Sequence, residues 1–124
     1  MHTRGPMQPA ETTYMSAQPL GGVMVAKITC PRVSDFEAAA LKTDLKKFVE
    51  APPAKLVVDL SDVLLVTSTG LGMLVQVRSA AQAAGGKVVL AGLSTELVDL
   101  FRLTNLHRLF TIAPDAKSGA EQIA

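Results

Sequence analysis

Three consecutive hydroxyl residues, Thr67, Ser68 and Thr69, stand directly before two closely spaced glycines, Gly70 and Gly72. An apolar run precedes them and an amphipathic pattern follows, so they lie where a strand gives way to a helix. A hydroxyl at such a junction can accept a phosphoryl group, or it can cap the helix by accepting a hydrogen bond from a free backbone amide. We expect Thr69 to be the N-cap, with the amide of residue 71 or 72 as donor.

The two glycines need an explanation beyond stability. Each glycine in a first turn lowers helix propensity by about 1 kcal/mol relative to alanine. We interpret them as leaving backbone amides open to an anion or a partner at the positive end of the helix dipole. A phosphoryl group on Thr69 would add a charge of about −1.5 to −2 over those amides. The pattern predicts phosphorylation of Thr69, with Ser68 as second choice; capping without phosphorylation is the alternative.

Few other residues are placed to carry chemistry. His107 is the only histidine beyond the first few residues, and the single cysteine, Cys30, has no evident activating partner. Asp59 and Asp62 flank the end of an apolar run, where carboxylates commonly serve as turn and cap residues, and no phosphate-binding loop accompanies them. We therefore expect a protein that is not an enzyme, with no catalytic residue, no metal and no cofactor.

Composition indicates one compact domain. The 124 residues, 48 % of them hydrophobic, can bury a core without disulfides or metals. The formal charge is +1 and no stretch combines clustered basic residues with aromatics, so no nucleic-acid partner is expected. No apolar run approaches the roughly 20 residues that span a bilayer, and we expect a cytoplasmic protein without membrane insertion. Residues 1–12 are expected to form a flexible arm and residues 13–124 the domain.

Hydrophobic periodicity predicts strands and helices that alternate after an initial hairpin. Two strand-like runs flank the hairpin turn at Pro19 to Gly22. Ser34 and Glu37 form a capping box, so a helix is expected over 35–50, stopped by the prolines at 52 and 53. The remaining elements are expected as a strand at 55–60, a helix at 70–84, a strand at 87–92, a helix at 95–104, a strand at 109–112 and a helix at 114–124.

This order, β-β-α-β-α-β-α-β-α, predicts an α/β fold: a mixed, mostly parallel sheet of four to five strands with about four helices. Ser94 or Thr95 is expected to cap the third helix, and Asn105 to end it in the left-handed conformation. Loops at the carboxyl ends of parallel strands commonly carry sites. Residues 64–70 form such a loop, which places the hydroxyl run where function is expected.

From Tyr14 to Ile112 the chain resembles a STAS domain of the bacterial anti-sigma factor antagonists, or anti-anti-sigma factors. The resemblance rests on two segments in order, KLVVDLSDVLLVTSTGLGMLVQVRSAAQAAGGKVVLAGLS and LVDLFRLTNLHRLF. It implies a protein that binds an anti-sigma factor, typically a serine/threonine kinase with a histidine-kinase-like ATPase fold, so that a sigma factor is released for transcription. Phosphorylation of the second hydroxyl of the motif ends that binding, and a serine/threonine phosphatase restores it.

The resemblance also assigns roles to single residues. It places Ser68 at the first hydroxyl position and Thr69 at the phosphoacceptor position. The partner-binding residues that it implies are Ser34, Thr67, Ser68, Thr69, Gly70, Leu71 and Gly72. Three positions depart from the family pattern: Thr67 stands where Asp is usual, Asn105 where Gly is usual, and Ser34 where many members have Asp.

A second interpretation keeps the STAS domain but not the switch. In it, the same corner docks a transporter, a lipid-trafficking complex or a nucleotide without being phosphorylated. Thr67 favours this interpretation, because it removes the negative charge that the family usually carries beside the acceptor.

Overall fold

The computed structural model describes residues 9–50 and 54–123. Its elements in chain order are β1 (Ala10–Glu11), β2 (Met15–Leu20), β3 (Val23–Ile28), β4 (Arg32–Val33), α1 (Asp35–Lys46), β5 (Lys55–Asp59), β6 (Leu65–Val66), α2 (Ser68–Ala83), β7 (Lys87–Ala91), α3 (Thr95–Leu103), the 3-10 turn η1 (Leu106–Arg108), β8 (Thr111–Ala113) and α4 (Ala116–Ile123).

The main sheet has the strand order β1-β2-β3-β5-β7-β8. Its first three strands are antiparallel, and the pairs β3–β5, β5–β7 and β7–β8 are parallel. The register aligns one row of side chains across the sheet: Ala17, Ala26, Val58, Leu90 and Ile112. The expected mixed, mostly parallel α/β sheet with four helices is confirmed.

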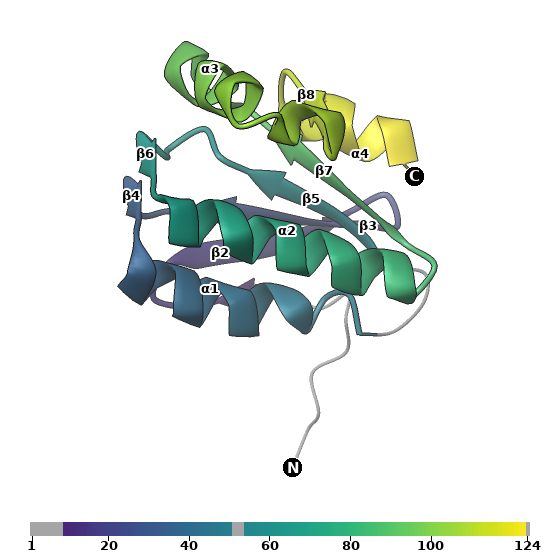
Figure 1. Ribbon diagram of the computed structural model, residues 1–124. Coiled ribbons are helices and arrows are strands. Elements are labelled where there is room, and N and C mark those ends of the chain that lie inside the picture. Colours follow the sequence, from purple (N-terminus) through teal and green to yellow (C-terminus); the bar gives the residue numbers. More distant parts are fainter. Residues whose placement is uncertain (1–8, 51–53, 124) are drawn as a thin grey trace.

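Helices cover both faces of this sheet (Figure 1). On one face α1, α2 and α3 enclose the larger core, to which Leu41, Leu74 and Phe101 belong. On the other face α4 packs Ala120 and Ile123 against Val57 and Val89. The central strands β5 and β7 are therefore buried on both sides, which explains their continuous apolar sequences.

Two features of the sheet were not predicted. Ala10 and Glu11 pair with β2 as a sixth strand, and β4 and β6 form a separate parallel pair of two residues each. Strands of only two residues are too short to show the alternation of apolar and polar residues from which strands are predicted. The sheet thus begins before the predicted domain boundary at residue 13, inside the predicted arm; residues 1–8 of that arm lie outside the described residues.

Several element ends differ from the prediction by two to four residues. The helix expected over 35–50 ends at Lys46, although Phe48 and Val49 beyond it remain buried. The prolines expected to stop it lie outside the described residues. The last strand begins at Thr111 rather than at 109, because Leu109 belongs to the end of the 3-10 turn.

The predicted capping residues of α1 and α3 are confirmed. The Glu37 carboxylate accepts a hydrogen bond from the Ser34 amide at 2.9 Å, as in a capping box, and an additional one from the Ser34 hydroxyl. Ser94 caps α3 by accepting from the Leu97 amide at 3.2 Å. Asn105 has φ 64°, the left-handed conformation expected after that helix.

Candidate functional site

The short pair β4–β6 brings the starts of α1 and α2 together. Arg32 lies beside Leu65 and Val33 beside Val66. The Thr67 amide then donates to the Val33 carbonyl at 3.0 Å, so the first residue before α2 is fixed to the last strand residue before α1. Figure 1 shows β4 and β6 at the end of the molecule where both helices begin. The predicted site residues Ser34 and Thr67 are therefore neighbours, although 33 positions separate them in the sequence.

Thr67, not Thr69, caps α2. The helix begins at Ser68, and the Thr67 hydroxyl accepts a hydrogen bond from the Gly70 amide at 3.4 Å. The same hydroxyl donates to the Val33 carbonyl at 3.3 Å. The predicted cap at Thr69 is wrong because the contacts with Val33 fix the extended backbone at residue 67, and the chain is already helical two residues later.

Ser68 and Thr69 occupy the exposed first turn of α2. Within the described part of the chain, neither hydroxyl forms a hydrogen bond. Both can therefore be reached by another protein, and modifying either removes no contact that stabilises the fold. We call Thr67, Ser68 and Thr69 the hydroxyl corner.

The two glycines of the motif have different roles. Gly70 is buried, and a Cβ at this position would lie 2.7 Å from Cγ1 of Val66 and 2.8 Å from the Val33 carbonyl oxygen. Gly72 is half-buried, and a Cβ there would have no atom within 4 Å. The interpretation of both glycines as open backbone is wrong for Gly70, which is needed for close packing against β4 and β6.

The remaining predicted site residues lie further from solvent. Leu71 is buried in the core, so its side chain contributes to the fold rather than to an exposed surface. Ser34 is half-buried, and its hydroxyl is bound to Glu37. That hydrogen bond, with a second from the Ser34 amide, holds the pKa of the Glu37 carboxyl below its usual value.

Three exposed apolar side chains belong to segments at the same end of the molecule as the hydroxyl corner, and they were not predicted from the sequence. Phe36 is 82 % exposed in the first turn of α1, while Leu64 and Leu65, which lead into the corner, are 71 % and 47 % exposed. We call these three residues the apolar rim. The signal for Phe36 was available, since it lies outside the apolar stripe of its helix. Leu64 and Leu65 carried no such signal, because they continue the apolar run after β5.

The charge around the corner is also uneven. The first turn of α1 carries Asp35 and Glu37, whereas the first turn of α2 carries no acidic residue and its cap is neutral. The positive end of the α2 dipole is therefore not offset by a nearby side chain of its own first turn. A negative group placed on Ser68 or Thr69 would be stabilised there.

Four other side chains singled out in the sequence have reactive groups: Asp59, Asp62, His107 and Cys30. Asp59 accepts a hydrogen bond from the Ser61 amide at 2.9 Å, and Asp62 pairs with Lys27 at 3.5 Å on the surface. Nδ1 of His107 lies 3.4 Å from the Phe101 carbonyl at the end of α3. Burial raises the pKa of the Cys30 thiol, which makes it less reactive.

Among the described residues, the structure contains no helix with the length and hydrophobicity that crossing a membrane requires.

Comparison with known proteins places this arrangement in context. Residues 14–119 match the family described as STAS domain. An anti-sigma factor antagonist from Mycobacterium paratuberculosis has a TM-score of 0.77 at 21 % identity, covering 98 % of each chain. The Bacillus cell fate determinant SpoIIAA, in its phosphorylated form, has a TM-score of 0.66 at 10 % identity, covering 87 % of this chain and 97 % of that one. The murine anion transporter solute carrier 26 family member A9 has a TM-score of 0.69 at 15 % identity, over 85 % of this chain and 18 % of the transporter. At these identities the structural similarities show a common fold.

Proposed function

The chain belongs to the STAS domain family, and from this premise we propose that it is an anti-sigma factor antagonist controlled by phosphorylation of Thr69. The observation that carries the proposal is the exposed first turn of α2, where the hydroxyls of Ser68 and Thr69 are free beside the apolar rim. The partner is an anti-sigma factor with a histidine-kinase-like ATPase fold, which also acts as the kinase. A serine/threonine phosphatase reverses the modification.

The unmodified hydroxyl corner and the apolar rim together have the properties of a protein–protein interface. The apolar rim supplies affinity, because removing Phe36, Leu64 and Leu65 from water is favourable. The hydroxyls of Ser68 and Thr69 are small and uncharged, and each can both donate and accept a hydrogen bond with the partner. Desolvating them costs little when those bonds are made.

A phosphoryl group changes this balance. It brings about −1.5 to −2 charges to the residue that the partner covers. Burying such a charge without a paired cation costs several kcal/mol, and each 1.4 kcal/mol lowers affinity about tenfold. One modification is therefore sufficient to release the partner.

The position of the cap allows the fold to tolerate phosphorylation of Thr69. Because Thr67 caps α2, phosphorylation of Thr69 breaks no capping hydrogen bond. The phosphoryl group would lie at the positive end of a helix whose first turn has no acidic residue. The fold thus accommodates the modified form, and the modification acts on the surface offered to the partner.

Ser68 provides a matched control for Thr69, because both are exposed in the same helical turn. We would capture the partner ATPase with the wild-type chain and measure its affinity by calorimetry for wild type, Thr69→Ala, Thr69→Glu and Ser68→Glu. We expect Thr69→Ala to bind within about threefold of wild type and Thr69→Glu at least tenfold more weakly. Ser68→Glu should lose distinctly less than Thr69→Glu.

Two results would refute the proposal. One is equal affinity of Thr69→Glu and wild type, because a charge at the acceptor would then not disturb the interface. The other is an equal loss in Ser68→Glu and Thr69→Glu, because the corner would then exclude charge without a specific role for Thr69. Incubating wild type with the partner and ATP supplies a second readout, in which mass spectrometry should find the phosphate on Thr69.

The phosphorylation-independent STAS module is the second candidate. The fold shared with an anion transporter favours it, since there the matching region is 18 % of a larger chain. The neutral cap at Thr67, where Asp is usual in antagonists, favours it too. In this case a partner would bind wild type, Thr69→Ala and Thr69→Glu alike, and no kinase would modify the corner.

A further inference from the structure

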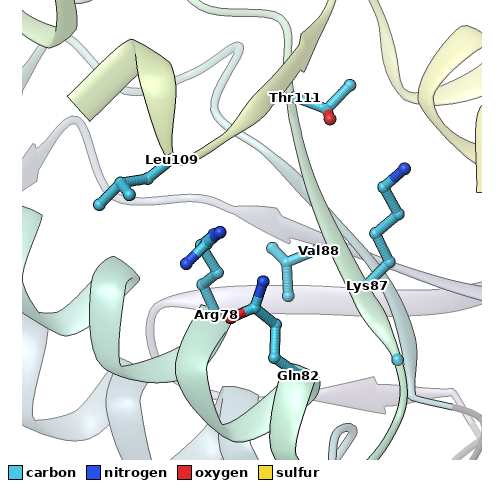
Figure 2. A pocket seen from close by; sticks show the side chains of 7 residues that line it. Arg78, Gln82, Lys87, Val88, Leu109 and Thr111 are labelled. Atoms are coloured by element: carbon cyan, nitrogen blue, oxygen red, sulfur yellow. The ribbon is translucent and has the colours of Figure 1, made fainter. Parts of the chain in front are cut away.

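A small hollow lies beside the second half of α2, away from the hydroxyl corner (Figure 2). Its volume is about 150 Å³, and its lining residues are Arg78, Gln82, Gly86, Lys87, Val88, Leu109 and Thr111. The hollow exists because β7 begins at Lys87 but pairs with β8 only from Val89 onward. Lys87 and Val88, the first two residues of β7, therefore have no neighbouring strand on the side of β7 that faces β8.

The hollow is lined by hydrogen-bond donors and positive charge. Arg78 and Gln82 are four residues apart, so they share one face of α2, and Figure 2 shows both side chains extending from the helix on the side of Val88 and Leu109. Lys87 extends from the opposite side of β7, away from Arg78 and Gln82. Two of the seven lining residues are cations and none is a carboxylate. Within the described residues, neither cation forms an ion pair.

The backbone of β7 adds a donor. The Lys87 amide donates to the Ala54 carbonyl at 2.7 Å, on the β5 side of the strand. Successive amides of a strand point to opposite sides, so the Val88 amide faces the hollow. A group placed there would meet a guanidinium, a carboxamide and a backbone amide, all of which can donate to oxygen.

We propose that this hollow binds a compact oxyanion of the phosphate class, either free phosphate or the phosphoryl end of a small metabolite. An Arg guanidinium recognises phosphate oxygens with paired hydrogen bonds. A volume of about 150 Å³ is below the roughly 300 Å³ at which pockets for larger ligands begin. It therefore fits one phosphoryl group but not a whole nucleotide. Arg78 lies ten residues beyond Ser68, about 15 Å along the helix, so this site does not rest on the proposed switch.

The test is a titration of the ¹⁵N-labelled chain with sodium phosphate at constant ionic strength, followed by NMR through the Nε–Hε signal of Arg78 and the side-chain amide signal of Gln82. The variants Arg78→Gln, Lys87→Gln and Arg102→Gln each remove one positive charge. The third is the matched control, because Arg102 is exposed on α3 and does not line the hollow. Thermal unfolding of each variant verifies that it is folded.

We expect saturable shifts of both signals in wild type. Arg78→Gln should weaken phosphate binding at least tenfold, Lys87→Gln by a smaller factor, and Arg102→Gln by less than twofold. Glycerol phosphate, titrated in parallel, distinguishes the two sources: tighter binding than phosphate indicates a phosphorylated metabolite, and weaker binding indicates the free ion.

Three outcomes would overturn the proposal. The first is linear shifts equal to those that sodium chloride produces. The second is an equal loss in Arg78→Gln and Arg102→Gln, which would indicate attraction by net charge alone. The third is shifts confined to the amides of residues 68–70, with the Arg78 and Gln82 signals unmoved, which would place the anion at the start of α2.

Discussion

Replacing Gly70 with alanine tests the packing of the corner. The new Cβ would lie 2.7 Å from Cγ1 of Val66 and 2.8 Å from the Val33 carbonyl oxygen, both shorter than a normal contact. Because the second of these atoms is backbone, the β4–β6 pair must shift to make room. Overpacking of this kind costs about 1–3 kcal/mol. Alanine offsets part of it through a helix propensity about 1 kcal/mol better than that of glycine.

Gly72→Ala is the matched control, because the same change on the same helix meets no atom within 4 Å. It should gain up to about 1 kcal/mol from helix propensity alone. The free energy of unfolding, measured by urea denaturation with circular dichroism, should thus fall in Gly70→Ala and rise or stay level in Gly72→Ala. Equal changes in the two variants would refute the assignment of Gly70 to packing and return both glycines to a common role.

Three further predictions concern the residues around the corner. Thr67→Ala should lower the free energy of unfolding by about 1 kcal/mol in urea denaturation, since it removes the cap of α2; an unchanged value would contradict the assigned cap. The depressed pKa of Glu37 means that its stabilising contribution is complete above the unfolded pKa of about 4.3. Thermal unfolding should show that this contribution is lost as the pH falls through the lower folded pKa, and Glu37→Gln should remove this part of the pH dependence. Phe36→Ser and Leu64→Ser should each weaken binding of the partner about tenfold in calorimetry without lowering the melting temperature, because both side chains are mostly exposed; unchanged affinity in both would remove the apolar rim from the interface.

Much of the fold could be predicted from local signals. The capping box at Ser34 and Glu37, the cap at Ser94 and the left-handed Asn105 each depend on residues close together in the sequence. The apolar runs of β5 and β7 identify strands buried on both faces. Such features are set by backbone geometry and periodicity, which a single sequence contains.

The details of the site depended on contacts between distant segments. Three successive hydroxyl residues could each cap a helix, and what selects Thr67 is its hydrogen bonding to Val33, 34 positions earlier. The same strand residue, together with Val66, requires glycine at position 70. No local pattern contains this information, because the pair β4–β6 has only two residues in each strand.

The most direct test of the central claim is the phosphorylation state of the chain in its own cells, compared between two pools. The protein bound to its ATPase partner would be separated from the free protein, and the phosphate on residues 67–69 would be located and quantified by mass spectrometry. The account predicts phosphate on Thr69 in the free pool and its near absence from the bound pool. Equal phosphorylation of Thr69 in both pools, or none in either, would contradict it.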